Sequence, residues 1–199
     1  YILFSPYLNV KITEGLSAEI KGAVRFEEEV GKAFVAETPL YEFFPPHNFS
    51  GVTASDNSMF QRNTRENHYT LFGTLNYTKK IADSHNIGIL GGYQQESYRN
   101  DQLDAFRNNF PTTDLWEISA GSPAGLNNAG TAYEWAIQSY FGRLNYDFKN
   151  KYLLEASFRN DASSRFPEGN RWAFFPSVSA GWRISEESFL TDVGWVDEV

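Results

Sequence analysis

Histidine, serine and acidic residues are the side chains of this sequence that could carry out catalysis or bind a metal ion. The three histidines, His47, His68 and His85, are far apart, and none belongs to a His-x-x-His or Glu-x-x-His pair of the kind that zinc sites use. His68 could act as a general base, but no serine is visibly placed with it as a nucleophile. The sequence also has no glycine-rich phosphate loop. We therefore predict no catalytic residue, no metal site, no cofactor and no enzymatic activity.

The segment DASSRFPEGNR, residues 161–171, brings acids and amides close together, as a calcium-binding loop would. A calcium site needs several converging oxygen atoms at a fixed spacing, and this segment does not match that spacing. Its Pro-Glu-Gly-Asn sequence is typical of a turn. We expect a connection between strands here and no ion site.

Six charged residues fall on one side of the alternating segments in the C-terminal third: Arg143, Asp147, Glu155, Arg159, Asp161 and Arg183. Two interpretations stay open for each of them. The residue could line a polar lumen that meets a plug or a passing solute, or it could form a cross-strand charge pair that fixes the register of a sheet. Together, so many charges cannot occupy a small dry core. The space that they face must hold water or a polar plug.

Two-residue alternation, strict from residue 140 onward, predicts strands at 135–148, 152–161 and 173–184, which position these charges. One face of each segment is apolar and includes Leu144, Leu154 and Val178. Aromatic residues gather near the segment ends, as in the interfacial girdles of transmembrane barrels. The segments have about nine to eleven residues, the length that a tilted membrane-spanning strand needs.

Four earlier segments, roughly 2–12, 16–27, 67–78 and 86–97, also alternate, which gives seven predicted strands. Their connections switch between short polar turns and two long loops, 28–66 and 99–134. Compact soluble domains rarely contain such loops, whereas membrane barrels commonly do. We therefore predict an all-β fold, an antiparallel meander that forms part of a large transmembrane β-barrel with long extracellular loops and short periplasmic turns. After Ile184 we expect a short helix, with Ser185 as its N-cap and Phe189, Val193 and Val196 at helical spacing.

The composition of the chain argues against several classes of protein. The net charge of −8 argues against nucleic acid, which needs a basic surface. The mean hydropathy of −0.46 does not exclude a barrel, because residues that face lipid and residues that face the lumen alternate. No run is long enough for a transmembrane helix, and the first residues do not resemble a signal peptide. The absence of cysteine excludes a disulfide scaffold.

Aromatic residues make up 17% of the chain, and many of them fall in the two predicted long loops. Tyr41, Phe43, Phe44, Trp116 and Tyr133 are the loop residues that we expect to contact a substrate or a partner. The alternative, that each of these rings only packs its own loop down, stays open.

The C-terminal third also resembles a known family. The stretch RNDASSRFPEGNRWAFFPSVSAGWRISEESFL, residues 159–190, is similar to the barrel signature of the SusC/RagA-type TonB-dependent outer-membrane transporters of Bacteroidetes. The resemblance is close over this third and extends to the rest of the chain only through the rhythm of strands and loops. Because seven strands cannot close a barrel of that size, we expect residues 1–199 to form part of one barrel domain, with the plug domain and the remaining strands outside this sequence.

The resemblance implies a function. It implies import of oligosaccharides or peptides across the outer membrane of a Gram-negative, Bacteroidetes-like bacterium, with energy supplied through TonB and with contact to outer-membrane lipid. It also implies a SusD-like surface lipoprotein that caps the extracellular loops. Two alternatives stay open at this point: a soluble β-sandwich that binds carbohydrate, and a passive porin.

Overall fold

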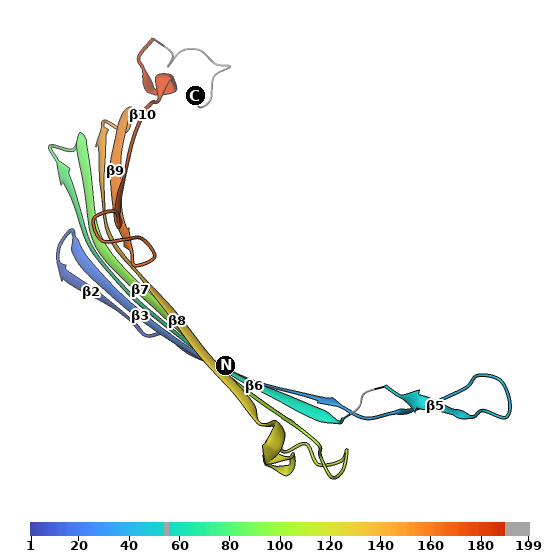
Figure 1. Ribbon diagram of the computed structural model, residues 1–199. Coiled ribbons are helices and arrows are strands. Elements are labelled where there is room, and N and C mark those ends of the chain that lie inside the picture. Colours follow the sequence, from blue (N-terminus) through green and yellow to red (C-terminus); the bar gives the residue numbers. More distant parts are fainter. Residues whose placement is uncertain (54–55, 190–199) are drawn as a thin grey trace. The chain divides into compact units, whose positions relative to one another are not determined.

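The computed structural model describes residues 1–53 and 56–189. Its strands are β1 (Ile2–Phe4), β2 (Tyr7–Thr13), β3 (Leu16–Val35), β4 (Pro39–Tyr41), β5 (Phe49–Val52), β6 (Ser58–Ile81), β7 (His85–Asn108), β8 (Asn127–Phe148), β9 (Tyr152–Ser163) and β10 (Trp172–Trp182). Three short 3-10 helices also occur, η1 (Ile118–Ala120), η2 (Pro123–Gly125) and η3 (Ile184–Glu186). Eight strands form one sheet in the order β1, β3, β6, β7, β8, β9, β10, with β2 also paired to β3, while β4 and β5 form a separate sheet of two strands (Figure 1). The predicted all-β meander is confirmed.

The sheet has almost no buried core. Among the described residues, only the side chains of Met59, Phe110 and Ser139 are buried. Leu144 and Val178, which a sandwich would bury between two sheets, are 41% and 74% exposed. No helix in residues 1–53 and 56–189 is long and apolar enough to cross a membrane. The single exposed layer rules out a β-sandwich for the described part of the chain.

The long strands extend further than the sequence predicts. β3 continues to Val35, β6 begins at Ser58, β7 continues to Asn108 and β8 begins at Asn127, so the predicted loops 28–66 and 99–134 shrink to residues 36–57 and 109–126. The prediction was wrong here because apolar alternation ends where both faces of a strand become polar, and the sequence signal ends with it. Hydrogen-bonded pairing of the strands does not need that signal.

Two smaller predictions also need correction. The strand predicted at 2–12 is interrupted between β1 and β2, because Pro6 has no N–H to donate to β3; its carbonyl accepts from Gly22 N instead, at 2.9 Å. Ser185 lies inside η3, whose N-cap is Arg183, so it does not cap a helix. The expected helix positions Val193 and Val196 lie outside the described residues.

Short turns join the strands at one end of the sheet. Lys149 and Asn150 connect β8 to β9 with φ of 56° each, the paired positive φ values of a type I′ hairpin turn. Ala82 and Asp83, between β6 and β7, also have positive φ. Gly15, between β2 and β3, has φ +76°, and a Cβ there would collide with the carbonyl oxygen of Thr78. Glycine is therefore required at this turn.

The chain divides into two compact units, which we describe separately. Unit 1 contains residues 1–2, 26–67 and 99–134, and unit 2 contains residues 3–25, 68–98 and 135–199. Unit 2 holds the three alternating segments of the C-terminal third. Unit 1 holds the connections 36–57 and 109–126.

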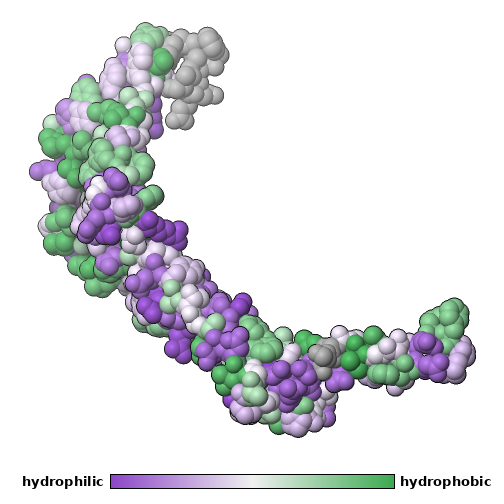
Figure 2. Space-filling model, in the orientation of Figure 1, coloured by the Kyte–Doolittle hydropathy of each residue, from purple (hydrophilic) through white to green (hydrophobic). Residues whose placement is uncertain are grey.

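Register in unit 2 fixes which residues share a face. Residues directly opposite each other in an antiparallel pair lie on the same face of the sheet. Leu144 is opposite Ala156, which is opposite Val178, so these three share one face, which we call the apolar face. Arg143 is opposite Ser157, which is opposite Ser177, and these lie on the other side, which we call the polar face. Figure 2 shows hydrophobic and hydrophilic surfaces within this part of the chain.

Two rows of aromatic rings cross the apolar face. One row runs through Tyr93, Tyr140 and Trp172, with ring centroids 5.2 and 5.9 Å apart. The other runs through Phe148, Tyr152 and Trp182, at 6.2 and 6.4 Å. Trp172 and Trp182 are ten positions apart on β10. At about 3.3 Å per residue and a tilt of about 45°, the two rows lie about 23 Å apart along a membrane normal, close to the height of about 25 Å for the apolar band of transmembrane barrels.

Candidate functional site

Five of the six predicted charged residues share the polar face of unit 2. The register places Asp147 opposite Leu153, Arg143 opposite Ser157, and Glu155 opposite Asn145; it also places Arg159 opposite Phe141, and Asp161 opposite Ser139. The register does not place Arg183, which follows the last residue of β10 and is the N-cap of η3. Its backbone N donates to Lys151 O at 2.8 Å. That the polar face lines a lumen stays a prediction.

Arg159 is held in a network that joins three strands. Its Nε donates to both carboxylate oxygens of Asp161, at 2.8 and 3.0 Å, and its guanidinium also donates to Gln94 Oε1 at 3.3 Å and to Ser139 Oγ at 3.0 Å. Ser139 is fully buried. The guanidinium lies 5.7 Å from the ring centroid of Phe141. Arg159 and Asp161 lie two residues apart on β9, so their ion pair does not join strands. The bonds of Arg159 to neighbouring strands go to the uncharged side chains of Gln94 and Ser139, and these, not a charge pair, can support the register of the sheet.

Phe141 and Gly92, to which sequence reasoning gave no role, also belong to this face, since Phe141 is opposite Arg159 and contacts Gly92. The Phe141 ring lies over Gly92 so closely that a Cβ at Gly92 would overlap it. It also stacks on Phe72, with centroids 5.7 Å apart and an interplanar angle of 22°. An aromatic ring that covers a strand glycine is a known device for holding a curved sheet. The only signal in the sequence was a glycine inside an alternating strand.

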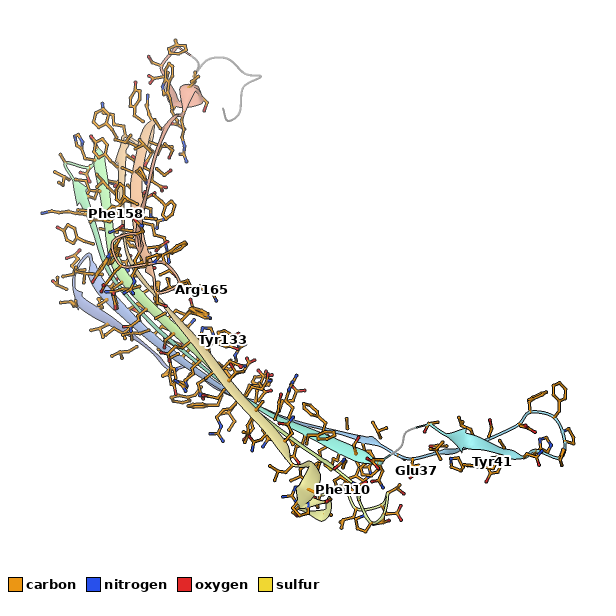
Figure 3. All side chains as sticks on the ribbon, viewed as in Figure 1. Glu37, Tyr41, Phe110, Tyr133, Phe158 and Arg165 are labelled. Carbon is orange, nitrogen blue, oxygen red and sulfur yellow. The ribbon has the colours of Figure 1, made fainter. Side chains whose placement is uncertain are left out.

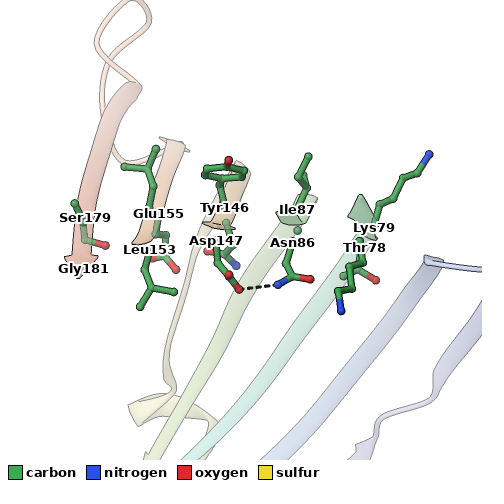
Figure 4. A pocket seen from close by; sticks show the side chains of 15 residues that line it. Thr78, Lys79, Asn86, Ile87, Tyr146, Asp147, Leu153, Glu155, Ser179 and Gly181 are labelled. Atoms are coloured by element: carbon green, nitrogen blue, oxygen red, sulfur yellow. Dashed lines mark hydrogen bonds between the residues drawn. The ribbon is translucent and has the colours of Figure 1, made fainter. Parts of the chain in front are cut away.

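Asp147 organises the β8–β9 turn. Its Oδ1 accepts from the backbone N of Asn150 at 2.8 Å, and its Oδ2 accepts from Asn86 Nδ2 at 2.9 Å, which ties the turn to β7 (Figure 4). Both carboxylate oxygens are therefore engaged. Asp147 also lines a groove of about 720 Å³ that crosses the ends of β6 to β10.

Arg143 and Glu155 differ from the other predicted charges placed on this face. Neither forms an ion pair with any residue that the structure describes. Arg143 is exposed, and Glu155 is half-buried and lines the same groove as Asp147 (Figure 4). An unpaired charge on a polar wall can bind a polar group of a plug or a solute. These two residues are therefore the strongest members of the predicted set.

His68, which we considered as a general base, is paired with an acid. Its Nε2 lies 2.6 Å from Glu96 Oε1, and its ring contacts those of Tyr98 and Trp135. Arg165 lies over Trp135, 5.0 Å from the ring centroid. This cluster holds the 164–171 connection against the sheet. Within the described residues, no group of three or more His, Asp and Glu is placed to hold a metal ion.

The predicted loop aromatics separate into two kinds in unit 1. Trp116 stacks on Phe34 at 5.5 Å, and its indole Nε1 donates to Thr113 O at 2.8 Å. Phe34 also packs against the buried ring of Phe110. Trp116 therefore holds its own loop in place, as the second interpretation proposed. Tyr133 lies on β8 and is 56% exposed.

Tyr41, Phe43 and Phe44 belong to the second kind. They lie on the hairpin formed by β4 and β5 and are 60%, 86% and 76% exposed. Figure 3 shows all the side chains as sticks and labels Tyr41 on this hairpin, Phe110 and Tyr133. The structure places these three rings close together in sequence and space, and it places Trp116 and Tyr133 elsewhere in unit 1. Whether any of the five contacts a substrate or a partner stays a prediction.

Comparison with known proteins identifies what this chain is similar to. TonB-dependent receptor P39 of Formosa agariphila is 29% identical over 195 residues, 96% of this chain and 18% of that protein. TonB-dependent receptor SusC of Bacteroides thetaiotaomicron is 35% identical over 128 residues, 63% of this chain and 12% of that protein. Among solved structures, the RagAB peptide transporter matches with a TM-score of 0.81 at 23% identity, over 96% of this chain and 20% of that one, which shows the same fold.

The chain thus spans about a fifth or less of the length of these proteins. The shared fold is that of a transporter barrel, in agreement with the unlike faces and the aromatic rows of unit 2. The model of the TonB-dependent receptor-like β-barrel matches residues 24–192, most of the sequence. The chain therefore belongs to the TonB-dependent receptor-like β-barrel family.

Proposed function

We propose that this chain forms part of the barrel wall of a SusC/RagA-type importer in the outer membrane of a Gram-negative bacterium of the Bacteroidetes. The whole protein takes up oligosaccharides or peptides and draws energy through TonB. Residues 1–199 contribute to one barrel domain, and the plug and the remaining strands come from elsewhere in that protein. The observation that carries the proposal is the sheet of unit 2, whose apolar face lies between two aromatic rows while its polar face carries charges of both signs.

The polar face is the wall of the lumen in this proposal. Arg143 and Glu155 contact the plug or the passing solute, because their charges are not neutralised by described neighbours. Arg159 helps to keep the wall in register through its bonds to Gln94 and Ser139, and Asp161 holds its guanidinium in place. Arg183 lies at the periplasmic edge, beyond the end of β10. The apolar face contacts the hydrocarbon of the outer membrane.

A SusD-like surface lipoprotein is the proposed partner. The chain offers it exposed aromatic side chains, chiefly Tyr41, Phe43 and Phe44, on segments joined to the ends of the strands opposite the short turns. The relatives support this class of transporter, since one is named SusC and a solved neighbour is the RagAB peptide transporter. Both sugars and peptides remain candidate substrates, because both classes of importer share this barrel wall.

Uptake by the full-length protein in its own outer membrane tests the proposal. We expect a labelled oligosaccharide mixture or a labelled peptide mixture to enter cells only when TonB is present, and uptake to stop when a protonophore collapses the proton-motive force. A passive porin would give uptake that is indifferent to both treatments. Uptake that survives deletion of every TonB homologue would overturn the proposal in favour of the porin.

Substitutions on the two faces refine this test. Arg143→Gln and Glu155→Gln should change the rate of uptake without lowering the amount of folded barrel, because the substituted side chains face the lumen. Val178→Ile on the apolar face is the matched control and should change neither quantity. Equal and unchanged uptake in all three variants would remove Arg143 and Glu155 from the proposed pathway.

A further inference from the structure

Strands β4 and β5 form a separate two-stranded hairpin, residues 39–52, with aromatic side chains on its strands and in its turn. Resting on the proposed function, we infer that this hairpin is the element that docks the surface lipoprotein, with Phe43 and Phe44 inserted into an apolar groove of that partner. The inference assigns these rings to a protein partner and not to the transported substrate. It does not include Trp116, whose ring is already stacked on that of Phe34 on β3.

The exposed aromatic area of the hairpin is a large part of the area that one partner buries in a standard interface. Four aromatic side chains are largely exposed: Tyr41 at 60%, Phe43 at 86%, Phe44 at 76% and Phe49 at 63%. An aromatic side chain buries about 150–250 Å² when it is covered, so the exposed parts of these four amount to about 500 Å². A standard interface buries about 800 Å² on each partner, and a patch of several hundred Å² on a small element marks an interaction site.

The hairpin lacks the support that would stabilise it alone. β4 and β5 have three and four residues and form their own sheet, apart from the main one. An isolated two-stranded hairpin is marginally stable at best in water and gains stability when another element covers its apolar side. Tyr41 and Phe49 are directly opposite each other, with centroids 6.1 Å apart, so they share the face that a partner would cover.

Polar contacts nevertheless fix the shape of the tip. The backbone N of Glu42 donates to Asn48 O at 2.8 Å, and Asn48 Nδ2 donates to the Glu42 carboxylate at 3.2 Å. His47 N donates to Phe44 O at 3.0 Å, and His47 Nδ1 lies 3.0 Å from Glu42 O. Phe43 and Phe44 lie inside this braced turn, with their rings edge to face at 5.3 Å. A tip that is already ordered loses less conformational entropy on binding, which favours a stable complex.

Charge and shape favour a protein over the other possible occupants. Residues 36–53 contain Glu37 and Glu42 and no lysine or arginine. Anionic lipid surfaces attract basic segments, so this hairpin is not suited to bind them. Sites for small ligands are concave and enclose most of the ligand, whereas this hairpin is a narrow finger. Aromatic side chains that contribute most to a protein interface usually insert into an apolar pocket of the partner, and two adjacent phenyl rings on a turn can do so.

Photo-crosslinking on the full-length transporter in intact cells tests the inference. A photoreactive phenylalanine analogue at Phe43 should crosslink to a SusD-like lipoprotein, identified by mass spectrometry. The same analogue at Leu103, which is 58% exposed on another element of unit 1, is the matched control and should give at least tenfold less of that product. Crosslinking of Phe43 only to lipopolysaccharide, or to no protein, would overturn the inference.

A second readout uses the double variant Phe43→Ser, Phe44→Ser. We expect the amount of lipoprotein that co-purifies with the full-length transporter to fall by at least tenfold, because two central anchors are lost. The heat-modifiable mobility of the folded barrel should be unchanged, as it should be in the control Leu103→Ser. Undiminished co-purification would refute the docking role. Loss of TonB-dependent uptake is a separate measurement, so a wrong transporter assignment would not be mistaken for a wrong docking site.

Discussion

Leu144 and Asn145 are neighbours on β8 whose side chains lie on opposite faces of the sheet, and an arginine at each position gives a direct test of what those faces meet. Leu144 is opposite Ala156 on the apolar face, and Asn145 is opposite Glu155 on the polar face. We expect Leu144→Arg to destabilise the full-length barrel strongly and Asn145→Arg to leave its stability nearly unchanged. The two positions are adjacent on the same strand and lie at almost the same depth in the proposed membrane, so the two substitutions differ mainly in the face on which the arginine lies.

The expected magnitude follows from the position of Leu144 in the membrane. It lies four residues from the aromatic row at Phe148, about 9 Å along the normal, in an apolar band about 23 Å high, and is therefore within about 3 Å of the midplane. An arginine on the lipid face at the midplane costs about 2–4 kcal/mol. At 1.4 kcal/mol per factor of ten, a cost of about 3 kcal/mol lowers the folding equilibrium constant about 100-fold. At position 145 an arginine meets Glu155, and we expect a change within about 0.5 kcal/mol.

Urea titration of the full-length protein in phospholipid vesicles, followed by heat-modifiable mobility on gels, measures both variants. The difference between them matters more than either absolute value, because both introduce the same charge. Equal destabilisation by the two substitutions would show that both faces meet the same medium. A larger cost for Asn145→Arg would mean that the faces have been assigned the wrong way round.

Three further outcomes are expected. A Cβ on Gly142 would lie 2.7 Å from the Phe158 ring, so Gly142→Ala should cost about 1–3 kcal/mol in urea titration, and much of that cost should disappear in a background of Phe158→Ala. Arg62 donates to Asp104 and lowers the pKa of that carboxyl below its usual 3.8, so their contact stabilises unit 1 above that pH and is lost as the pH falls through the lower, folded-state pKa. The protection of amides around Asp104, measured as the exchange rate relative to that of an unstructured peptide at the same pH, should therefore fall only in strong acid, whereas in Asp104→Asn it should already be lower at pH 7. Trp116→Ala should make residues 109–126 sensitive to protease in intact cells, and an unchanged digestion pattern would show that its stacking does not hold the loop.

Much of unit 2 could be predicted from sequence because the membrane imposes a strong pattern. Where one face meets hydrocarbon and the other meets water, period-two alternation is strict, and the faces of β8, β9 and β10 follow from it residue by residue. The alternation also identified the charges Arg143 and Glu155, but it could not tell them from Arg159 and Asp161. That distinction depends on distances such as the 2.8 Å from Arg159 Nε to Asp161, which sequence does not contain.

Unit 1 was predicted less well for a related reason. Its strands are held mainly by backbone hydrogen bonds, and exposed pairs such as Arg62 with Asp104 and Arg99 with Glu134, at 2.8 and 3.1 Å, join their side chains. Such pairs join positions that are tens of residues apart, so no local window of sequence shows them. The β4–β5 hairpin was missed because its two strands are short and are separated by a turn with two prolines.

The connections between strands have a consequence for which parts of the chain can be reached from each side of the proposed barrel. On one side, β2–β3, β6–β7 and β8–β9 are linked by two or three residues each, so an antibody or protease confined to that side would find almost no chain to recognise. On the other side, the connections between β3 and β6, between β7 and β8 and between β9 and β10 are longer, and the last of them comprises residues 164–171. If the proposed orientation holds, surface labelling and epitope insertion within this part of the protein should therefore succeed mainly in these three connections and not in the short turns.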